Sequence, residues 1–268
     1  MSLIRMNLYR FIRTKTVYVL LLITVAIISL VILDQTSGTM PLDEEILQQA
    51  GVDADNEVGL TFGVSMITSV PQLTVEMLGS GILLVFTAIF AAIFSNSERA
   101  GGYLKNLNSC AGAKEQIFLG KIVPVMVFAL LNLWIVPLAG VLVGAPMGLQ
   151  QTAELFSGKF ILYMTVQWML HVAYGIFVLM IMELTRSLLA GILVGIFAGM
   201  GVGVMMISFV ENIFRANGAI TGHMLVYMIR IIAPENMGET LMMALLTATI
   251  SIVLYMGIGA LTFKTRDY

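Results

Sequence analysis

Residues 16–33 read TVYVLLLITVAIISLVIL, a run without a charged side chain that ends abruptly at Asp34. An α-helix rises about 1.5 Å per residue, so a run of this length spans most of the roughly 30 Å hydrocarbon core of a bilayer. Inside lipid each backbone polar group must be paired within the protein, and a helix achieves this within one segment. The run therefore predicts a transmembrane helix.

Five further apolar runs follow the first one along the chain. The 268 residues are 59% apolar and 11% charged, whereas soluble domains average about 45–50% and about 25%. The five runs are separated by polar stretches and cover residues 72–94, 122–143, 160–182, 187–210 and 240–263. We therefore predict an all-α integral membrane protein that forms one domain, 1–268, with six transmembrane helices.

Two of the polar segments carry charges of opposite sign. Residues 34–71 contain several acidic side chains and neither lysine nor arginine, whereas residues 95–121 contain Arg99, Lys105, Lys114 and Lys121. Lysine and arginine accumulate in the cytoplasmic loops of membrane proteins. We expect 34–71 to be extracellular and 95–121, together with both termini, to be cytoplasmic.

Two segments are apolar in part but are not expected to span the membrane. Residues 1–15 combine apolar and basic side chains at helical spacing, as in an interfacial helix that lies on the membrane surface. Residues 211–239 contain a short apolar stretch interrupted by His223 and Arg230, which indicates a re-entrant or interfacial hairpin. If that stretch crossed fully, the C-terminal Lys264 and Arg266 would move outside, against the positive-inside rule.

The motifs of common enzymes do not occur in the sequence. It contains no HExxH, GxSxG or paired-cysteine pattern, and the Gly120-Lys121 pair is followed by Ile122 where a Walker A motif requires Ser or Thr. We therefore expect no catalytic residue, bound metal or cofactor on this chain, and no nucleic-acid partner.

Few ionisable residues fall within the apolar runs. Glu76 and His171 are candidates for a transport pathway, because polar groups at membrane depth are often functional. For Glu76, and for Glu183 at the inner end of its run, the alternative is contact with headgroup water. For His171 the alternative is a hydrogen bond to a neighbouring helix.

The fifth run carries a glycine at every fourth position. The four glycines are Gly191, Gly195, Gly199 and Gly203. Because residues four apart share one helical face, this face allows another backbone to approach closely. The pattern indicates either packing within the subunit or contact with a second subunit.

The basic loop carries the motif that is most informative about function. Residues 97–106 read SERAGGYLKN and are followed by Lys114 and by Lys121, directly before the third run. Within this motif, Glu98, the glycine four residues later and the Leu-Lys-Asn sequence resemble the loop of ABC-2 type exporter permeases. The N-terminal amphipathic helix, the six spans and the hairpin before the last span are similar to that family as well.

The resemblance implies a function for the loop and a set of partners. In the family this loop forms a coupling helix that docks on a cytoplasmic ATPase, and matching positions here are Glu98, Gly102, Tyr103, Leu104 and Lys105. It implies ATP and Mg²⁺ on separate ABC ATPase subunits and a second permease subunit, either the same or a related chain. The size of the chain and its compact cytoplasmic parts are similar to those of bacterial peptide-antibiotic or lantibiotic immunity permeases. This similarity implies that the protein resides in the bacterial plasma membrane.

Two functions are open at this point. The first is the transmembrane subunit of an ATP-driven exporter for an apolar or amphipathic substrate, such as a peptide, an antibiotic or a lipid-like drug. A transport pathway whose walls are rich in Met, Leu, Ile and Phe would bind such a substrate better than it would bind an ion. The alternative is an ATP-independent secondary carrier or a membrane assembly factor, although the two halves of the chain show no internal repeat of the kind found in many carriers.

The predicted topology can be tested with cysteines at Asn56 and Asn106, which lie in the acidic and the basic loop. A membrane-impermeant thiol reagent added to intact cells should label position 56, and position 106 should react only after the membrane is opened. Labelling of both positions from the same side would contradict the six-span topology.

Overall fold

The computed structural model describes residues 3–37, 67–100, 114–150, 153–215 and 218–265. Within these ranges the chain is helical and forms no β-strand, apart from one isolated bridge between Ser69 and Gln150. The principal helices are α1 (Leu3–Arg13), α2 (Lys15–Ser37), α4 (Val70–Gly79), α5 (Ile82–Ala100), α7 (Lys114–Ala139), α8 (Gly158–Thr185), α9 (Leu188–Gly199), α10 (Val202–Phe214), α11 (Leu225–Ile231) and α12 (Met237–Lys264). Shorter turns of π- or 3₁₀-helix cover Gly140–Gly144, Ala145–Met147, Ala153–Phe156 and Thr221–His223.

Five of these helical segments are long and apolar enough to cross a membrane. They are Lys15–Asp34, Ile82–Arg99, Gln116–Met147, Gly158–Thr185 and Met237–Lys264. A sixth span results if α9 and α10, which meet at an angle of 57°, are counted as one bent element. The prediction of an all-helical chain is confirmed for the described residues, and five or six of its helices are long and apolar enough to span a membrane.

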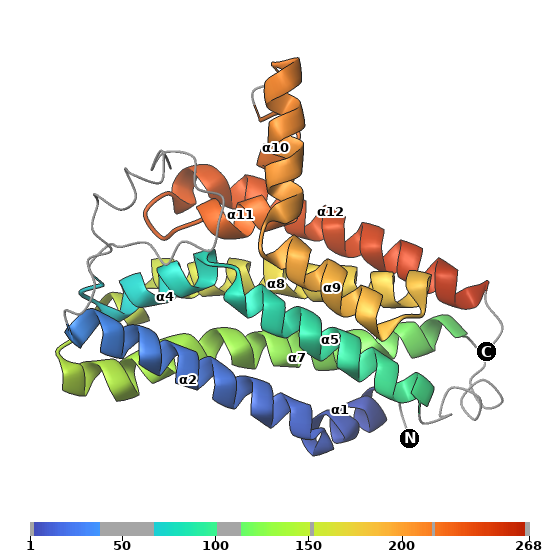
Figure 1. Cartoon of the computed structure of the whole chain (residues 1–268), viewed down its shortest axis with the longest axis horizontal. Coiled ribbons are helices and arrows are strands. Elements are labelled where there is room, and N and C mark those ends of the chain that lie inside the picture. The colour runs from blue at the N-terminus through green and yellow to red at the C-terminus, as the bar shows by residue number, and fades with distance from the viewer. Residues whose placement is uncertain (1–2, 38–66, 101–113, 151–152, 216–217, 266–268) are drawn as a thin grey trace.

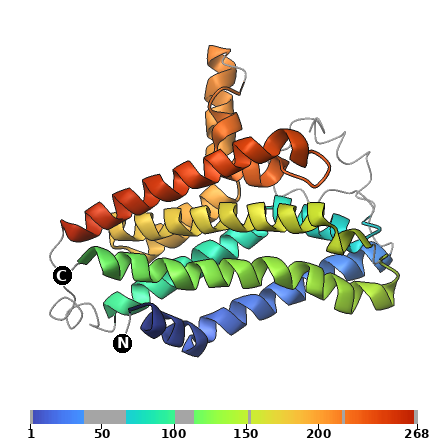
Figure 2. The ribbon, with the colours of Figure 1, turned by 180° about the vertical axis from the view of Figure 1, so that it is seen from behind.

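The long helices lie side by side in one bundle (Figure 1). Helix α8 packs against α5, α7, α9 and α12, while α7 also contacts α1 and α2. Helix α1 and the last turn of α12 lie at the same end of the bundle, and the view from behind agrees (Figure 2). We call this end, where α5 and α7 flank residues 101–113, the loop end.

The first two helices form a corner at Thr14. Its backbone N–H donates to the carbonyl of Phe11, and its hydroxyl donates to the carbonyl of Arg10, 2.8 Å away. Helix α1 packs on α7, where the side-chain amide of Asn7 lies against Gly120, a position without room for a Cβ atom. The structure thus has a separate amphipathic helix before the first long apolar one, as the sequence predicted for 1–15 and 16–33.

The second predicted span, 72–94, is not one continuous helix. The chain turns at Ser80 and Gly81, where Gly81 has a φ of +83°, and separates α4 from α5. A Cβ atom on Gly81 would lie 2.5 Å from the carbonyl oxygen of Gly199 on a neighbouring helix. Only glycine can adopt this backbone conformation and also allow so close a contact. A glycine at this position therefore permits the break between the two helices.

The fifth predicted span, 187–210, is also interrupted. The break lies at Met200 and Gly201, and Gly201 has a φ of +82°. Beyond it α10 leaves the bundle and stands out from its side (Figures 1 and 2). Met206, Phe209 and Phe214 of α10 are at least two-thirds exposed, at 66%, 67% and 77%.

Arg230 of α11 lies between the two breaks. Its guanidinium donates to the carbonyl of Gly199, 3.3 Å away, and it fills the space beside both Gly81 and Gly201. The carbonyl at the C-terminal end of α9 therefore receives a donor that the interrupted helix no longer supplies. Residues 211–239 also contain the end of α10 and the short helix α11, so this segment is more helical than a simple hairpin.

The segment 95–121, predicted as a loop, is helical at both ends, and residues 101–113 lie outside the described residues. Helix α5 continues to Ala100 and α7 begins at Lys114, so both ends of the predicted loop are helical. The third span, predicted over 122–143, begins at Lys114 and ends in a π-helical turn. The fourth and sixth apolar runs, 160–182 and 240–263, lie within α8 and α12. Most of the predicted acidic loop, 34–71, lies outside the described residues.

Three of the four periodic glycines pack inside the subunit. A Cβ atom on Gly195 would lie 2.6 Å from the Cβ of Ala88 on α5, and one on Gly199 would lie 2.9 Å from the hydroxyl of Tyr174 on α8. Gly191 likewise meets Met182 and Ala92. Gly203 lies beyond the break, and the nearest atom to its Cβ position is Met224 Cε at 4.0 Å.

We expect Gly195→Leu to destabilise the fold by about 2 kcal/mol or more, because overpacking forces α9 away from α5. Gly203→Leu is the matched control and should be tolerated. Thermal unfolding of the detergent-solubilised variants measures the difference. Equal tolerance of leucine at both positions would show that α9 does not pack against α5 through this face.

Candidate functional site

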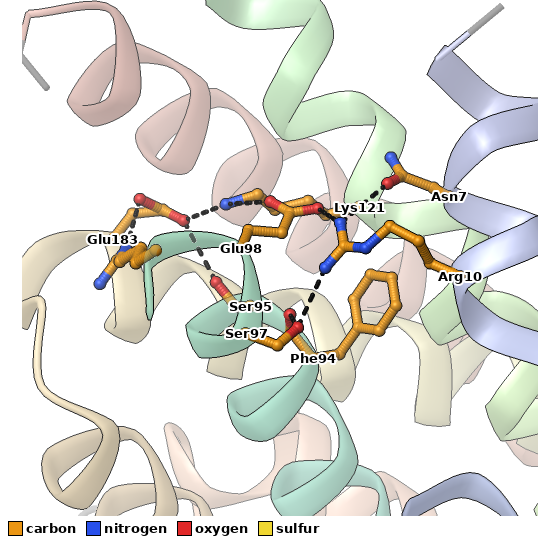
Figure 3. A network of polar contacts seen from close by, with 9 residues as sticks. Asn7, Arg10, Phe94, Ser95, Ser97, Glu98, Lys121 and Glu183 are labelled. Carbon is orange, nitrogen blue, oxygen red and sulfur yellow. Dashed lines mark hydrogen bonds and ion pairs between the residues drawn. The ribbon is translucent and has the colours of Figure 1, made fainter. Parts of the chain in front are cut away.

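Five charged side chains meet at the loop end of the bundle, and Figure 3 labels all of them except Arg99. We call them the charged cluster: Arg10 of α1, Glu98 and Arg99 of α5, Lys121 of α7 and Glu183 of α8. Four helices that are distant in sequence each contribute at least one member. Glu98, Lys121 and Glu183 are almost fully shielded from solvent, with exposures of 2%, 0% and 0%.

Glu98 joins the N-terminal helix to the rest of the bundle. Its Oε1 accepts a hydrogen bond from Arg10 Nη1 at 2.6 Å, and its Oε2 lies 3.1 Å from Lys121 Nζ. Arg10 also donates to the hydroxyl of Ser97 at 3.0 Å and to the side-chain carbonyl of Asn7 at 3.4 Å. One carboxylate thereby connects α1, α5 and α7.

Lys121 lies at the centre of the charged cluster. Its Nζ is 2.9 Å from Glu183 Oε1 and 3.1 Å from Glu98 Oε2, so a single ammonium group bridges two carboxylates. The same Nζ lies 5.1 Å from the centre of the Phe263 ring, near the end of α12. Lys121 therefore links α5 and α8 and contacts a fifth helix.

Glu183 is held by three donors. Arg99 Nη2 lies 2.6 Å from its Oε2, while Lys121 and the hydroxyl of Ser95 donate to its Oε1 at 2.9 and 3.4 Å. Glu98 and Arg99 follow Ser95 by three and four positions, so each lies beside Ser95 on the surface of α5. Helix α5 can therefore present its hydroxyl, carboxylate and guanidinium groups toward α8 and α7 together.

Burial of these charges is tolerable only because they neutralise one another. An isolated buried ion costs several kcal/mol, and removal of one partner from a buried pair typically costs about 3–5 kcal/mol. The three cations and two carboxylates leave one positive formal charge, and Arg10 and Arg99, the outermost members, keep side-chain exposures of 24% and 14%. The charged cluster thus holds the ends of α1, α5, α7 and α8 in one arrangement.

The charged cluster includes one residue that the sequence placed at a docking surface. Glu98 matches a position of the coupling loop, and its carboxylate faces inward, where it accepts a hydrogen bond from Arg10 and forms an ion pair with Lys121. The other four predicted coupling residues, Gly102, Tyr103, Leu104 and Lys105, lie outside the described residues. In the sequence these four residues fall between the end of α5 at Ala100 and the start of α7 at Lys114.

The charged cluster also changes the interpretation of Glu183. Its expected contact with headgroup water is wrong, because the side chain is fully buried among Ser95, Arg99 and Lys121. Lys121 was assigned to the loop before the third span, although it lies within α7 with the buried Phe118 and Val125 one turn away on either side. A single lysine within an otherwise apolar stretch of helix is the sequence signal that would have identified Lys121 as a buried residue.

The two predicted pathway residues lie in different environments. Glu76 of α4 is exposed, which fits contact with water or headgroups, whereas His171 of α8 is fully buried. The ring Nδ1 of His171 is 2.8 Å from the carbonyl oxygen of Gln167, one turn earlier. His171 Nε2 and Gln167 Oε1 find no hydrogen-bond partner among the described residues. The described ranges contain no group of three or more His, Cys, Asp or Glu arranged to hold a metal ion.

We expect Lys121→Met to destabilise the protein by about 3 kcal/mol or more, because it leaves two buried carboxylates facing each other without their shared cation. Lys159→Met is the matched control, since Lys159 is exposed near the start of α8. The apparent melting temperature in detergent should fall for the first variant only. Equal melting temperatures would mean that the charged cluster contributes nothing to stability.

Comparisons with protein family models, with curated proteins and with solved structures found no match. The function proposed below therefore depends on the chain's own residues, on their geometry and on the resemblance of residues 97–121.

Proposed function

We propose that this chain is the transmembrane subunit of an ATP-driven exporter of the ABC-2 type. It moves an apolar or amphipathic substrate out of the cytoplasm or out of the membrane. A separate cytoplasmic ATPase binds ATP and Mg²⁺ and docks on residues 101–113, and a second permease subunit completes the pathway. In this proposal the protein resides in the bacterial plasma membrane with both termini in the cytoplasm.

The observation that carries the proposal is the charged cluster beside the loop. A partner that moves residues 101–113 would move the ends of α5 and α7, since these helices flank that segment. Glu98 and Lys121 join those two ends to each other and, through Arg10 and Glu183, to α1 and α8. Movement of the loop would therefore be shared by several helices.

The chemistry of this connection suits a switch between two arrangements. Buried ion pairs are strong only at good geometry, so a shift of a few ångström breaks one pairing and favours another. ATP binding supplies differential binding energy to the partner, and that energy can select one arrangement of the helix ends. Within this scheme Glu98 positions the loop through α5 and does not itself contact the ATPase.

Helix α8 offers an observation that favours the second candidate, a secondary carrier. Tyr163, Gln167 and His171 lie on one face of α8, each completely buried. Gln167 donates to the carbonyl of Ile229 at 2.9 Å, while its Oε1 remains without a partner among the described residues. A buried polar face with unused hydrogen-bonding capacity is a common feature of ion and proton pathways. Association with an ATPase separates the two candidates.

The proposed function predicts that Tyr103→Ala with Leu104→Ala abolishes co-purification of the partner ATPase. Buried aromatic and aliphatic anchors often contribute about 2 kcal/mol or more each, which corresponds to about thirtyfold in affinity. Both residues lie in the loop, so insertion into the membrane should be unaffected.

Phe156→Ala provides the matched control, since Phe156 is 86% exposed on the opposite side in the predicted topology. The measurement is recovery of the ATPase with each variant at equal membrane levels. Unchanged recovery with the double variant would count against the coupling role. If the wild type recovers no ATPase, the secondary carrier becomes the better proposal.

A further inference from the structure

Helix α1 presents two faces with different chemistry. One face packs into the protein, with Asn7 2% and Phe11 5% exposed, and the Phe11 ring meets that of Phe90 edge-on at 5.7 Å. The rest of the helix surface, which we call its outer face, is uncovered, and Ile4, Tyr9 and Ile12 on it are 49%, 54% and 61% exposed. The outer face of α1 therefore carries exposed apolar and aromatic side chains although the helix is already anchored by its inner face.

Basic side chains border these apolar side chains. Arg13 and Lys15 are exposed at the corner between α1 and α2, and Arg5 is exposed one turn before Tyr9. The guanidinium of Arg13 lies 4.6 Å from the centre of the Tyr9 ring, a cation–π contact that holds the charge beside the apolar side chains. No acidic residue occurs between Met1 and Leu33. The corner thus combines exposed cations, aromatic rings and aliphatic side chains.

Tyr18 extends the same surface onto α2. It is 57% exposed, and its hydroxyl donates to the carbonyl of Ile12 at 2.7 Å. Tyrosine is enriched where a membrane protein passes from lipid to water, because its ring is apolar and its hydroxyl is polar. Tyr9 and Tyr18 therefore indicate that this corner lies at the level of the lipid headgroups.

We infer that the outer face of α1 is a binding surface for anionic phospholipid. Ile4 and Ile12 enter the acyl-chain boundary, and Arg13 and Lys15 contact phosphate groups. A zwitterionic lipid satisfies the apolar side chains equally well but carries no net charge for the cations. An anionic lipid surface accommodates the apolar side chains and also attracts the cations. Each basic side chain near such a surface increases the binding affinity about fivefold. The inference requires no ATPase and holds for either function considered above.

Lipid bound to the outer face of α1 also affects the contacts that its inner face makes. Arg10 reaches Glu98 from the inner face, one turn from the exposed Arg13. Lipid bound on the outer face restricts the position from which Arg10 can make that contact. The composition of the membrane is thereby connected to the charged cluster.

The test uses the full chain in lipid nanodiscs with the single cysteine removed as Cys110→Ser. A bimane fluorophore is attached to a cysteine at Ile12, and its quenching is compared for brominated phosphatidylglycerol and brominated phosphatidylcholine. Brominated phosphatidylglycerol should quench at a lower mole fraction, by tenfold or more for two cations. Added salt should reduce the difference, because screening weakens exposed charge pairs. A fluorophore at Met242, which is 73% exposed on α12, should respond equally to both lipids.

Arg13→Gln with Lys15→Gln should remove most of the lipid preference at position 12. Arg215→Gln is the matched control, since Arg215 is exposed at the far end of α10, and it should leave the preference intact. Equal quenching by both lipids in the wild type, or a preference that persists in the double variant, would overturn the inference. Quenching by neither lipid would also overturn it and would favour an acidic protein surface as the partner of α1.

Discussion

The pairing of Lys121 with two buried carboxylates constrains the rest of the structure. An ammonium group with no exposed surface requires anionic partners within about 3–4 Å, and these come from α5 and α8. Each carboxylate in turn requires a further donor, which Arg10 and Arg99 provide. The ends of four helices must therefore converge, and apolar packing farther along the bundle is compatible with that convergence because glycines let α9 approach α5.

The two helix breaks place a second constraint on the bundle. Gly81 and Gly201 both have positive φ, and Arg230 fills the space beside both of them. The breaks are coupled because the backbone of Gly199 approaches Gly81 too closely for any side chain. Interrupted helices that meet within a membrane protein often mark the region that rearranges during transport. Charged contacts thus lie at the loop end, and irregular backbone lies at the start of α5 and at the end of α9.

Most of the long helices could be predicted from local sequence. The charged cluster could not, because it depends on contacts between residues that are distant in the sequence. Runs such as 160–182 and 240–263 predicted α8 and α12 well, because a long uncharged stretch has few alternatives in lipid. The breaks were missed because glycine is frequent throughout this chain and nothing local distinguishes Gly81 or Gly201. Glu98 was singled out, but its buried ion pairs were not foreseen, and the alternative of headgroup water for Glu183 does not fit its complete burial. Apart from the pair of Glu98 with Lys121, their partners lie 62 to 88 residues away in the sequence, and only the packed bundle brings them together.

The central claim is that the charged cluster joins the loop-bearing helices to the rest of the bundle as one cooperative unit. A double-mutant cycle on Arg10→Gln and Glu98→Gln, measured by unfolding in detergent, tests it most directly because the pair joins α1 to α5 at 2.6 Å. The account predicts that the effects of the two substitutions on the free energy of unfolding are non-additive by about 1 kcal/mol or more. Additivity within about 0.3 kcal/mol would show that the two side chains do not interact and would contradict the account.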